Sequence, residues 1–206
     1  MWKLTGIFLL FFPVLAQAGA QIYEPLSASV KAVMQRAVSD RAVPRLAFSS
    51  ESEGKAWLAT MTKRLEKRMP SQRERDDFLT TVHYEAIRAG LDPQLVLSVI
   101  QIESGFKKYA ISIAGARGYM QVMPFWVREI GVSDHNLFHL RTNLRYGCTI
   151  LRHYLDIEKG GYFRALGRYN GSLGQADYPD LVISAWHSTW AYPLTTADGA
   201  SFGQGG

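Results

Sequence analysis

The sequence is short of cysteine and has fewer acidic than basic residues. A single cysteine, Cys148, occurs in 206 residues, so no disulfide can form within the chain. It lies in an apolar helical pattern, which favours a small buried side chain over a nucleophile. The sequence has 18 Asp and Glu and 23 Lys and Arg, which gives a net charge of +5. Anionic cell wall or membrane surfaces are therefore better candidate partners than nucleic acid for an exported chain.

Long hydrophobic runs are absent beyond the first fifteen residues. The apolar run 4–15 is followed by Ala-Gln-Ala at 16–18, the small-residue pattern of a signal peptidase site. The run is shorter than the roughly 20 apolar residues that cross a bilayer. We therefore expect a signal peptide, 1–18, cleaved after Ala18 or, as second choice, after Ala20. No membrane span and no lipid-anchor cysteine are expected in the mature chain.

Strand signals are also missing. No alternating run of Val, Ile and Thr is bounded by turn pairs, and helical periodicity continues through most of the chain. We predict an all-α protein without internal repeats. Residues 21–75 are expected to form a helical N-terminal extension, with a clear helix at 54–68 but no motif that discloses a role. Residues 76–192 carry the motifs below, and 193–206 are expected to be a flexible tail.

Two central helices have marked ends. Ser71 stands three residues before Glu74, the capping-box spacing, and predicts a helix that runs to Gly90. Asp92 and the proline after it predict the start of the next helix, 93–104. Gly105 can adopt the left-handed conformation that ends a helix.

The later helices are less sharply bounded. Thr142 is expected to cap a long amphipathic helix that ends at Gly160. A short helix or turn is expected around Pro124, and another short helix over 162–170. Tyr178 is expected to open a last helix that runs toward residue 192.

Glu103 falls on the apolar face of the helix predicted at 93–104. Apolar residues precede it at the i, i+3, i+4 spacing of one helix face, namely Val96, Val99 and Ile100. Burial and the negative end of the helix dipole both disfavour a charged carboxyl, so we expect a raised pKa and an acid that can donate a proton near neutral pH. On this pattern alone, a glutamate that reaches solvent or pairs with Arg117 fits slightly better.

The residues after Glu103 strengthen the chemical interpretation. Ser104 can hydrogen-bond the neighbouring carboxyl, the "GARG" glycines predict a tight turn, and Gln121 offers a donor and an acceptor. The alternative is that these glycines only turn the chain. No other acid occurs before Glu129, whereas two-carboxylate glycosidases need a partner and substrate-assisted ones do not.

Four ordered segments resemble the catalytic domain of the lytic transglycosylases related to the soluble lytic transglycosylase of Gram-negative bacteria. They are "GLDPQLVLSVIQIESGF", "ISIAGARGYMQVMP", "NLRYGCTILRHYL" and "RYNGS", within roughly 82–192. The resemblance implies a goose-lysozyme-like helical fold in the periplasm. It also implies cleavage of the β-1,4 bond between N-acetylmuramic acid and N-acetylglucosamine of peptidoglycan, without added water, cofactor or metal. Glycan strands are the implied partner, and other cell-envelope proteins stay open as partners.

By the same resemblance, Glu103 is the single catalytic acid and base. It would protonate the glycosidic oxygen and then accept the proton of the muramyl C6 hydroxyl, which attacks C1 to give a 1,6-anhydro product. Ser104 would orient Glu103. The remaining implied substrate-binding residues are Gly115, Ala116, Gly118, Met120, Gln121, Tyr169 and Asn170.

Three residues depart from the family pattern. Tyr119 replaces the usual leucine and would either add an aromatic wall to the site or fill the core. Trp126 follows the proline of the motif, and packing is expected for it in preference to sugar stacking. Arg168 precedes Tyr-Asn, and a solvated side chain is expected there in preference to a contact with an acidic stem peptide.

Other functions remain as alternatives. A hydrolytic lysozyme on the same fold would use water in place of the C6 hydroxyl, and a wall-binding or assembly factor would have no turnover. Further chemistries lack their motifs. His135 and His139 have no glutamate of the zinc pattern HExxH, and Ser104 and Ser172 lack a GxSxG elbow.

Overall fold

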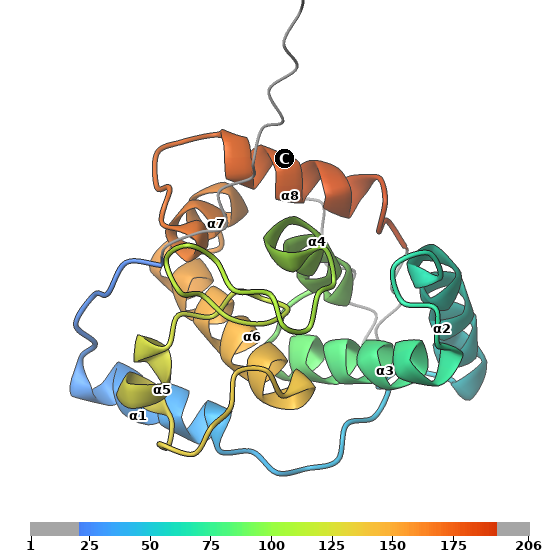
Figure 1. The fold of residues 1–206 in the computed structure, drawn as a ribbon, viewed down its shortest axis with the longest axis horizontal. Helices are drawn as coiled ribbons and strands as arrows, with labels where there is room; N and C mark the ends of the chain where they lie inside the picture. Colours follow the sequence, from blue (N-terminus) through green and yellow to red (C-terminus); the bar gives the residue numbers. More distant parts are fainter. Residues whose placement is uncertain (1–20, 193–206) are drawn as a thin grey trace, which may run out of the picture.

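The computed structural model describes residues 21–192 and confirms the all-α prediction for them (Figure 1). The helices are α1 (Ala28–Val38), α2 (Glu51–Leu65), α3 (Gln72–Arg88), α4 (Pro93–Ser104), α5 (Phe125–Ile130), α6 (Leu140–Ile157), α7 (Tyr162–Asn170) and α8 (Asp177–His187). Within this range, β pairing is confined to isolated bridges between residues 111 and 122. The expected signal peptide, 1–18, and the expected tail, 193–206, lie outside the described residues.

Helix α4 lies at the centre of the part of the chain formed by residues 72–192. Figure 1 shows it between α8 and α3, and it contacts both of these helices. Helix α6 contacts α3 and α7, and α7 contacts α8, which completes the surrounding layer. Every residue from Pro93 to Ile100 is buried. A helix that is apolar on all sides has to be enclosed in this way.

The predicted helix ends of the central region are confirmed. The Ser71 hydroxyl accepts a hydrogen bond from the Glu74 backbone N–H at 3.3 Å. The Asp92 carboxylate accepts one from the Gln94 N–H at 2.7 Å. Gly105 ends α4 with φ 56°, in the left-handed conformation that favours glycine.

Two later helix ends were predicted wrongly. Thr142 does not cap α6, which begins at Leu140 after His139, because the Asn143 N–H already donates to the His139 carbonyl. Helix α8 ends at His187 and does not continue toward residue 192. The chain turns there so that Trp190 becomes buried, with its indole N–H donating to Gln101 Oε1 at 3.0 Å.

The N-terminal extension packs against the rest of the described chain at two places. Helix α1 contacts α5 and α6, and α2 contacts α3. Phe48 and Trp57 enclose the fully buried imidazole of His83, with ring centroids 4.4 Å and 5.1 Å away. Burial lowers the pKa of His83 to about 4. The expected boundary between residues 75 and 76 lies inside α3, which is one continuous helix.

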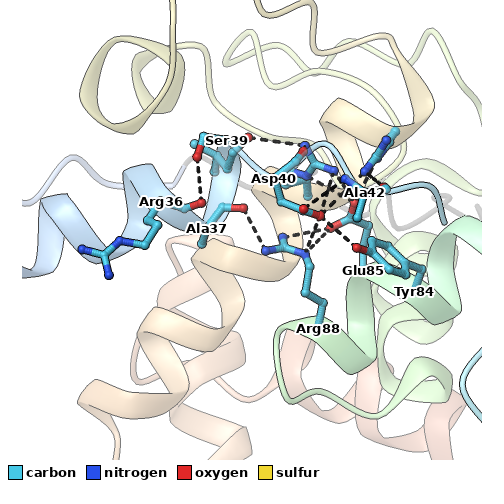
Figure 2. Close-up of polar contacts among 11 residues, drawn as sticks. Arg36, Ala37, Ser39, Asp40, Ala42, Tyr84, Glu85 and Arg88 are labelled. Atoms are coloured by element: carbon cyan, nitrogen blue, oxygen red, sulfur yellow. Dashed lines mark hydrogen bonds and ion pairs between the residues drawn. The ribbon is translucent and has the colours of Figure 1, made fainter. Parts of the chain in front are cut away.

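A buried ionic cluster joins the extension to α3 and α6 (Figure 2). The fully buried Glu85 carboxylate accepts hydrogen bonds from Arg88 Nε and Arg145 Nη2, both at 2.9 Å. Arg88 also donates to the Ala37 carbonyl at 2.8 Å, and Arg145 donates to the carbonyl of Asp40. The cluster therefore fixes the chain after α1 to α3 and α6.

Glu85→Ala should lower the free energy of unfolding by about 3 kcal/mol, because it leaves three partly buried arginines without their common carboxylate. Glu51→Gln is the control, since the exposed pair of Glu51 with Lys55 should contribute less than about 1 kcal/mol. Urea denaturation measures both changes. Equal midpoints for the two variants would contradict the role of Glu85.

Acidification should destabilise the protein through His83. His83 has an ordinary pKa of 6.5 in the unfolded chain but a pKa of about 4 in the folded chain. Its contribution to the free energy of unfolding is therefore fully present above pH 6.5 and falls as the pH is lowered toward 4. The maximal loss is about 3 kcal/mol. Unfolding curves of wild type and His83→Phe between pH 7 and pH 4 test this. Parallel losses in the two proteins would show that other groups are responsible.

Candidate active site

Glu103 occupies the last turn of α4, with 7% of its surface exposed. The apolar residues that share its face, Val96, Val99 and Ile100, are fully buried, so the predicted inward position of the carboxyl is confirmed. Gly105 and Phe106 both have positive φ angles, 56° and 67°, which turn the chain sharply after the helix. The carboxyl is therefore carried by a rigid element and bounded by a fixed turn.

Tyr178, at the start of α8, holds the Glu103 carboxyl. Its hydroxyl donates a hydrogen bond to Glu103 Oε1 at 2.7 Å. Burial, followed by the charge of Glu103, raises the pKa of Tyr178 well above 10, so the phenol stays protonated and keeps donating. Sequence reasoning used Tyr178 only as a helix start. Nothing local in "QADYPDL" indicates that it faces a carboxyl 75 residues earlier.

The segment 110–123 forms a small hairpin beside the end of α4. Bridges pair Ile111 with Arg117 and Arg117 with Val122. Gly118 has φ 76°, and a Cβ there would lie 2.6 Å from the Leu137 carbonyl oxygen, so only glycine fits. Gln121 also has a positive φ, 47°, and its Nε2 donates to the Gly118 carbonyl at 2.8 Å. The side-chain amide of Gln121 thus stabilises the hairpin itself.

Asn143, on α6, holds the hairpin through hydrogen bonds of its side chain. The sequence did not predict a role for this residue. Its Oδ1 accepts from the Met120 N–H at 2.8 Å, and its Nδ2 donates to the carbonyls of Arg117 and Leu137, each at 2.8 Å. The side chain is fully buried. The available signal was a polar residue on an apolar helix face, which indicates a buried hydrogen-bonding role without naming its partners.

Ser104 and Tyr169 connect the hairpin to α4 and α7. The Ser104 hydroxyl lies 2.7 Å from the Tyr119 carbonyl oxygen and 3.2 Å from that of Ile100. The Tyr169 hydroxyl donates to the Met120 carbonyl at 2.7 Å. Burial, and next the charge of Glu103, raise the pKa of Tyr169 well above 10. Both side chains therefore fix backbone carbonyls of the hairpin close to the acid.

The predicted site residues fall into two groups. One group lies where α4, the hairpin, α7 and α8 meet: Glu103, Ser104, Gly118, Met120, Gln121, Tyr169 and Asn170. The Nδ2 of Asn170 is buried and has no hydrogen-bond partner among the described residues. Gly115 and Ala116 lie in the far turn of the hairpin, where Ala116 exchanges two hydrogen bonds with Ser112. A substrate contact for these two residues stays a prediction.

The three departures from the family pattern have structural explanations. Tyr119 is buried with its ring centroid 4.9 Å from that of Phe78, so it fills the core. Trp126 is buried as well, in agreement with the packing prediction. Arg168 differs from the expected solvated position, because its guanidinium pairs with Glu158 and, at 3.0 Å, with Glu24.

Across residues 21–192, no group of three or more His, Cys, Asp or Glu could hold a metal ion. In the same part of the chain, no helix combines the length and apolar character of a membrane span. Cys148 is fully buried, and burial raises the pKa of its thiol. Two surface pockets lie elsewhere, one between α1 and α6 and one around Asp40 and His135.

Comparisons with known proteins match the central part of the chain. Residues 81–178 match the family model described as Transglycosylase SLT domain. A transglycosylase of Enterobacteria phage PRD1 is 35% identical over 98 residues, which are 48% of this chain and 36% of the phage protein. The membrane-bound lytic murein transglycosylase C of Actinobacillus pleuropneumoniae serotype 5b is 45% identical over 47 residues, 23% of this chain and 13% of that protein.

The chain thus spans about a third of the phage relative's length and a smaller share of the bacterial one. Among solved structures, an inactive mutant of the lytic transglycosylase Slt from Pseudomonas aeruginosa aligns with a TM-score of 0.44 and 23% identity. That alignment covers 61% of this chain and 23% of the Slt chain. Residues 81–178, slightly less than half of the chain, are thus similar in sequence to the transglycosylase SLT domain.

Proposed function

We propose that this chain is an exported peptidoglycan lytic transglycosylase with Glu103 as its single general acid and base. It would cleave the β-1,4 bond between N-acetylmuramic acid and N-acetylglucosamine and form 1,6-anhydro-N-acetylmuramic acid. The observation that carries the proposal is the buried Glu103 carboxyl at the end of α4, bonded to Tyr178 inside the family-matched segment. Relatives named as lytic murein transglycosylases support peptidoglycan as the substrate.

The first chemical step needs a protonated Glu103. Burial disfavours the charged carboxylate, which favours an acid that can protonate the glycosidic oxygen as the bond to C1 breaks. The hydrogen bond from Tyr178 restricts rotation of the carboxyl. A Glu103 carboxyl held in one orientation lowers the activation barrier, because the proton does not have to be aligned with the glycosidic oxygen in each turnover.

The second step uses Glu103 as the base. After it has given up its proton, the carboxylate accepts the proton of the muramyl C6 hydroxyl, whose oxygen attacks C1. Tyr178 stabilises the carboxylate in this state by donating to Oε1. Glu103 thereby regains its proton, and a new bond between C1 and the C6 oxygen takes the place of the broken glycosidic bond. The cycle therefore needs neither water nor a second carboxyl.

Two alternatives predict different products. A hydrolytic lysozyme on the same site would deliver water to C1 and leave a reducing end heavier by one water. A wall-binding or assembly factor would bind glycan without any product. Both are separated from the proposed reaction by mass spectrometry of a peptidoglycan digest.

The acid itself is tested by Glu103→Gln, which keeps the side-chain shape and removes the transferable proton. Release of anhydro-muropeptides from purified peptidoglycan should fall at least about 1,000-fold. Glu66→Gln, an exposed change directly after α2, is the matched control and should keep wild-type activity. Mass spectrometry of the soluble products gives the measurement. Product release by Glu103→Gln at the wild-type rate would refute the mechanism.

Tyr178→Phe tests the hydrogen bond to the acid. Activity should decline as the pH rises through the Glu103 pKa, because the acid must start protonated. Loss of a donor to the carboxylate raises that pKa, so the alkaline limb of the rate profile should move to higher pH, while the rate at the optimum falls about tenfold. Tyr109→Phe, at an exposed tyrosine, is the control. A limb that stays in place or moves to lower pH would exclude the role given to Tyr178.

A further inference from the structure

Residues 21–24 lie against the candidate active site although the family-matched segment begins only at residue 81. Gln21 is 4% exposed. Its Oε1 accepts hydrogen bonds from the Trp126 indole N–H at 2.9 Å and from the Met123 N–H at 3.3 Å. Its Nε2 donates to the Gln121 carbonyl at 3.4 Å. One amide therefore holds the end of the hairpin and the start of α5.

The same short segment also reaches α7. The Glu24 carboxylate pairs with Arg168 Nη1 at 3.0 Å, and the Arg168 Nε donates to Glu158. Tyr23 packs edge-on against Phe125, with ring centroids 5.6 Å apart. The residue after Arg168 is Tyr169, which donates to the Met120 carbonyl. Residues 21–24 thus connect two segments that meet beside Glu103.

These contacts close a ring of interactions around the site. Gln21 binds the segment 121–126, Glu24 binds Arg168, and Tyr169 returns to Met120. The ring includes Gln121, a non-glycine residue at φ 47°. Such a conformation costs free energy and persists only where the surroundings hold it. The Gln21 contact to the Gln121 carbonyl is one of those restraints.

We propose that residues 21–24, here called the N-terminal strap, are positioning residues for glycan binding by this site. Gln21 fixes the backbone from Gln121 to Met123, and Glu24 fixes the end of α7 through Arg168. The strap acts on the residues expected to contact substrate and leaves the pair of Glu103 and Tyr178 untouched. This inference rests on the proposed function, because it assigns the same site a dependence on residues outside the family-matched segment.

A purely structural anchor makes a different prediction. It would change the melting temperature and leave the kinetics of the folded protein unaltered. A positioning role should weaken binding of glycan in the folded protein, because the hairpin backbone would sample conformations that no longer fit the substrate. The Michaelis constant should then rise, while kcat and the pH dependence set by Glu103 remain.

The test compares Gln21→Ala with the matched control Gln35→Ala, an exposed glutamine on α1. With soluble peptidoglycan glycan strands as substrate and well below the melting temperatures, Gln21→Ala should raise KM about tenfold. Its kcat should stay within about twofold of wild type, with an unmoved pH profile. The Trp126 indole N–H signal in an NMR spectrum should shift in Gln21→Ala and not in the control, because its acceptor is lost.

Glu24→Gln supplies a second variant that does not disturb a buried residue, since half of the Glu24 side chain is exposed. It should raise KM about threefold, and it decides the question if Gln21→Ala does not fold. Wild-type KM values in Glu24→Gln and in folded Gln21→Ala would overturn the strap.

Binding of glycan strands in a Glu103→Gln background separates the two proposals. A wild type that releases no anhydro-muropeptides refutes the proposed function, and the strap is then judged by binding alone. Weaker binding after Gln21→Ala in that background supports the strap. Unchanged binding, or no binding even before the Gln21 substitution, refutes it.

Discussion

The burial of α4 is the constraint on which the other features of the site depend. A helix with apolar residues on every side is stable only when it is enclosed, and α3, α8 and the layer formed by α6 and α7 enclose it. This enclosure extends to the last turn of α4, so Glu103 is carried inward together with the apolar residues on its face. The position of the carboxyl is thus a consequence of hydrophobic packing along the whole helix.

A second requirement follows from placing irregular backbone beside that buried helix end. The hairpin 110–123 exposes carbonyls and N–H groups that neighbouring strands cannot satisfy, because only isolated bridges are present there. Side chains from distant elements take these groups as partners: Asn143 from α6, Ser104 from α4, Tyr169 from α7 and Gln21 from the strap. Residues between positions 21 and 169 therefore converge because one short loop needs hydrogen bonds, and this convergence places the hairpin next to Glu103.

The N-terminal extension contributes to the same architecture in two ways. Its ionic cluster around Glu85 ties the chain after α1 to α3 and α6, away from the site. The strap contacts the site directly through Gln21 and Glu24. Arg168 shows how these functions overlap. This residue departs from the family pattern, and the sequence predicts no ion-pair partner for it. In the structure, its guanidinium joins α7 to Glu24 and Glu158.

The sequence by itself determined the helical class and the ends of α3 and α4, and it placed Glu103 on the apolar face of its helix. Each of these depends on residues a few positions apart: Ser71 and Glu74, Asp92 and Gln94, or the apolar spacing before Glu103. The start of α6 was predicted wrongly because the first hydrogen bond of this helix is accepted by His139, which makes no side-chain cap bond. The end of α8 was predicted wrongly because the tertiary contact of Trp190 decides where the chain turns. Only the tertiary structure brought Tyr178 to Glu103 and Gln21 to the hairpin. The partners are separated by 75 residues for Tyr178 and by 100 and 102 residues for Gln21, and periodicity and capping carry no information over such separations.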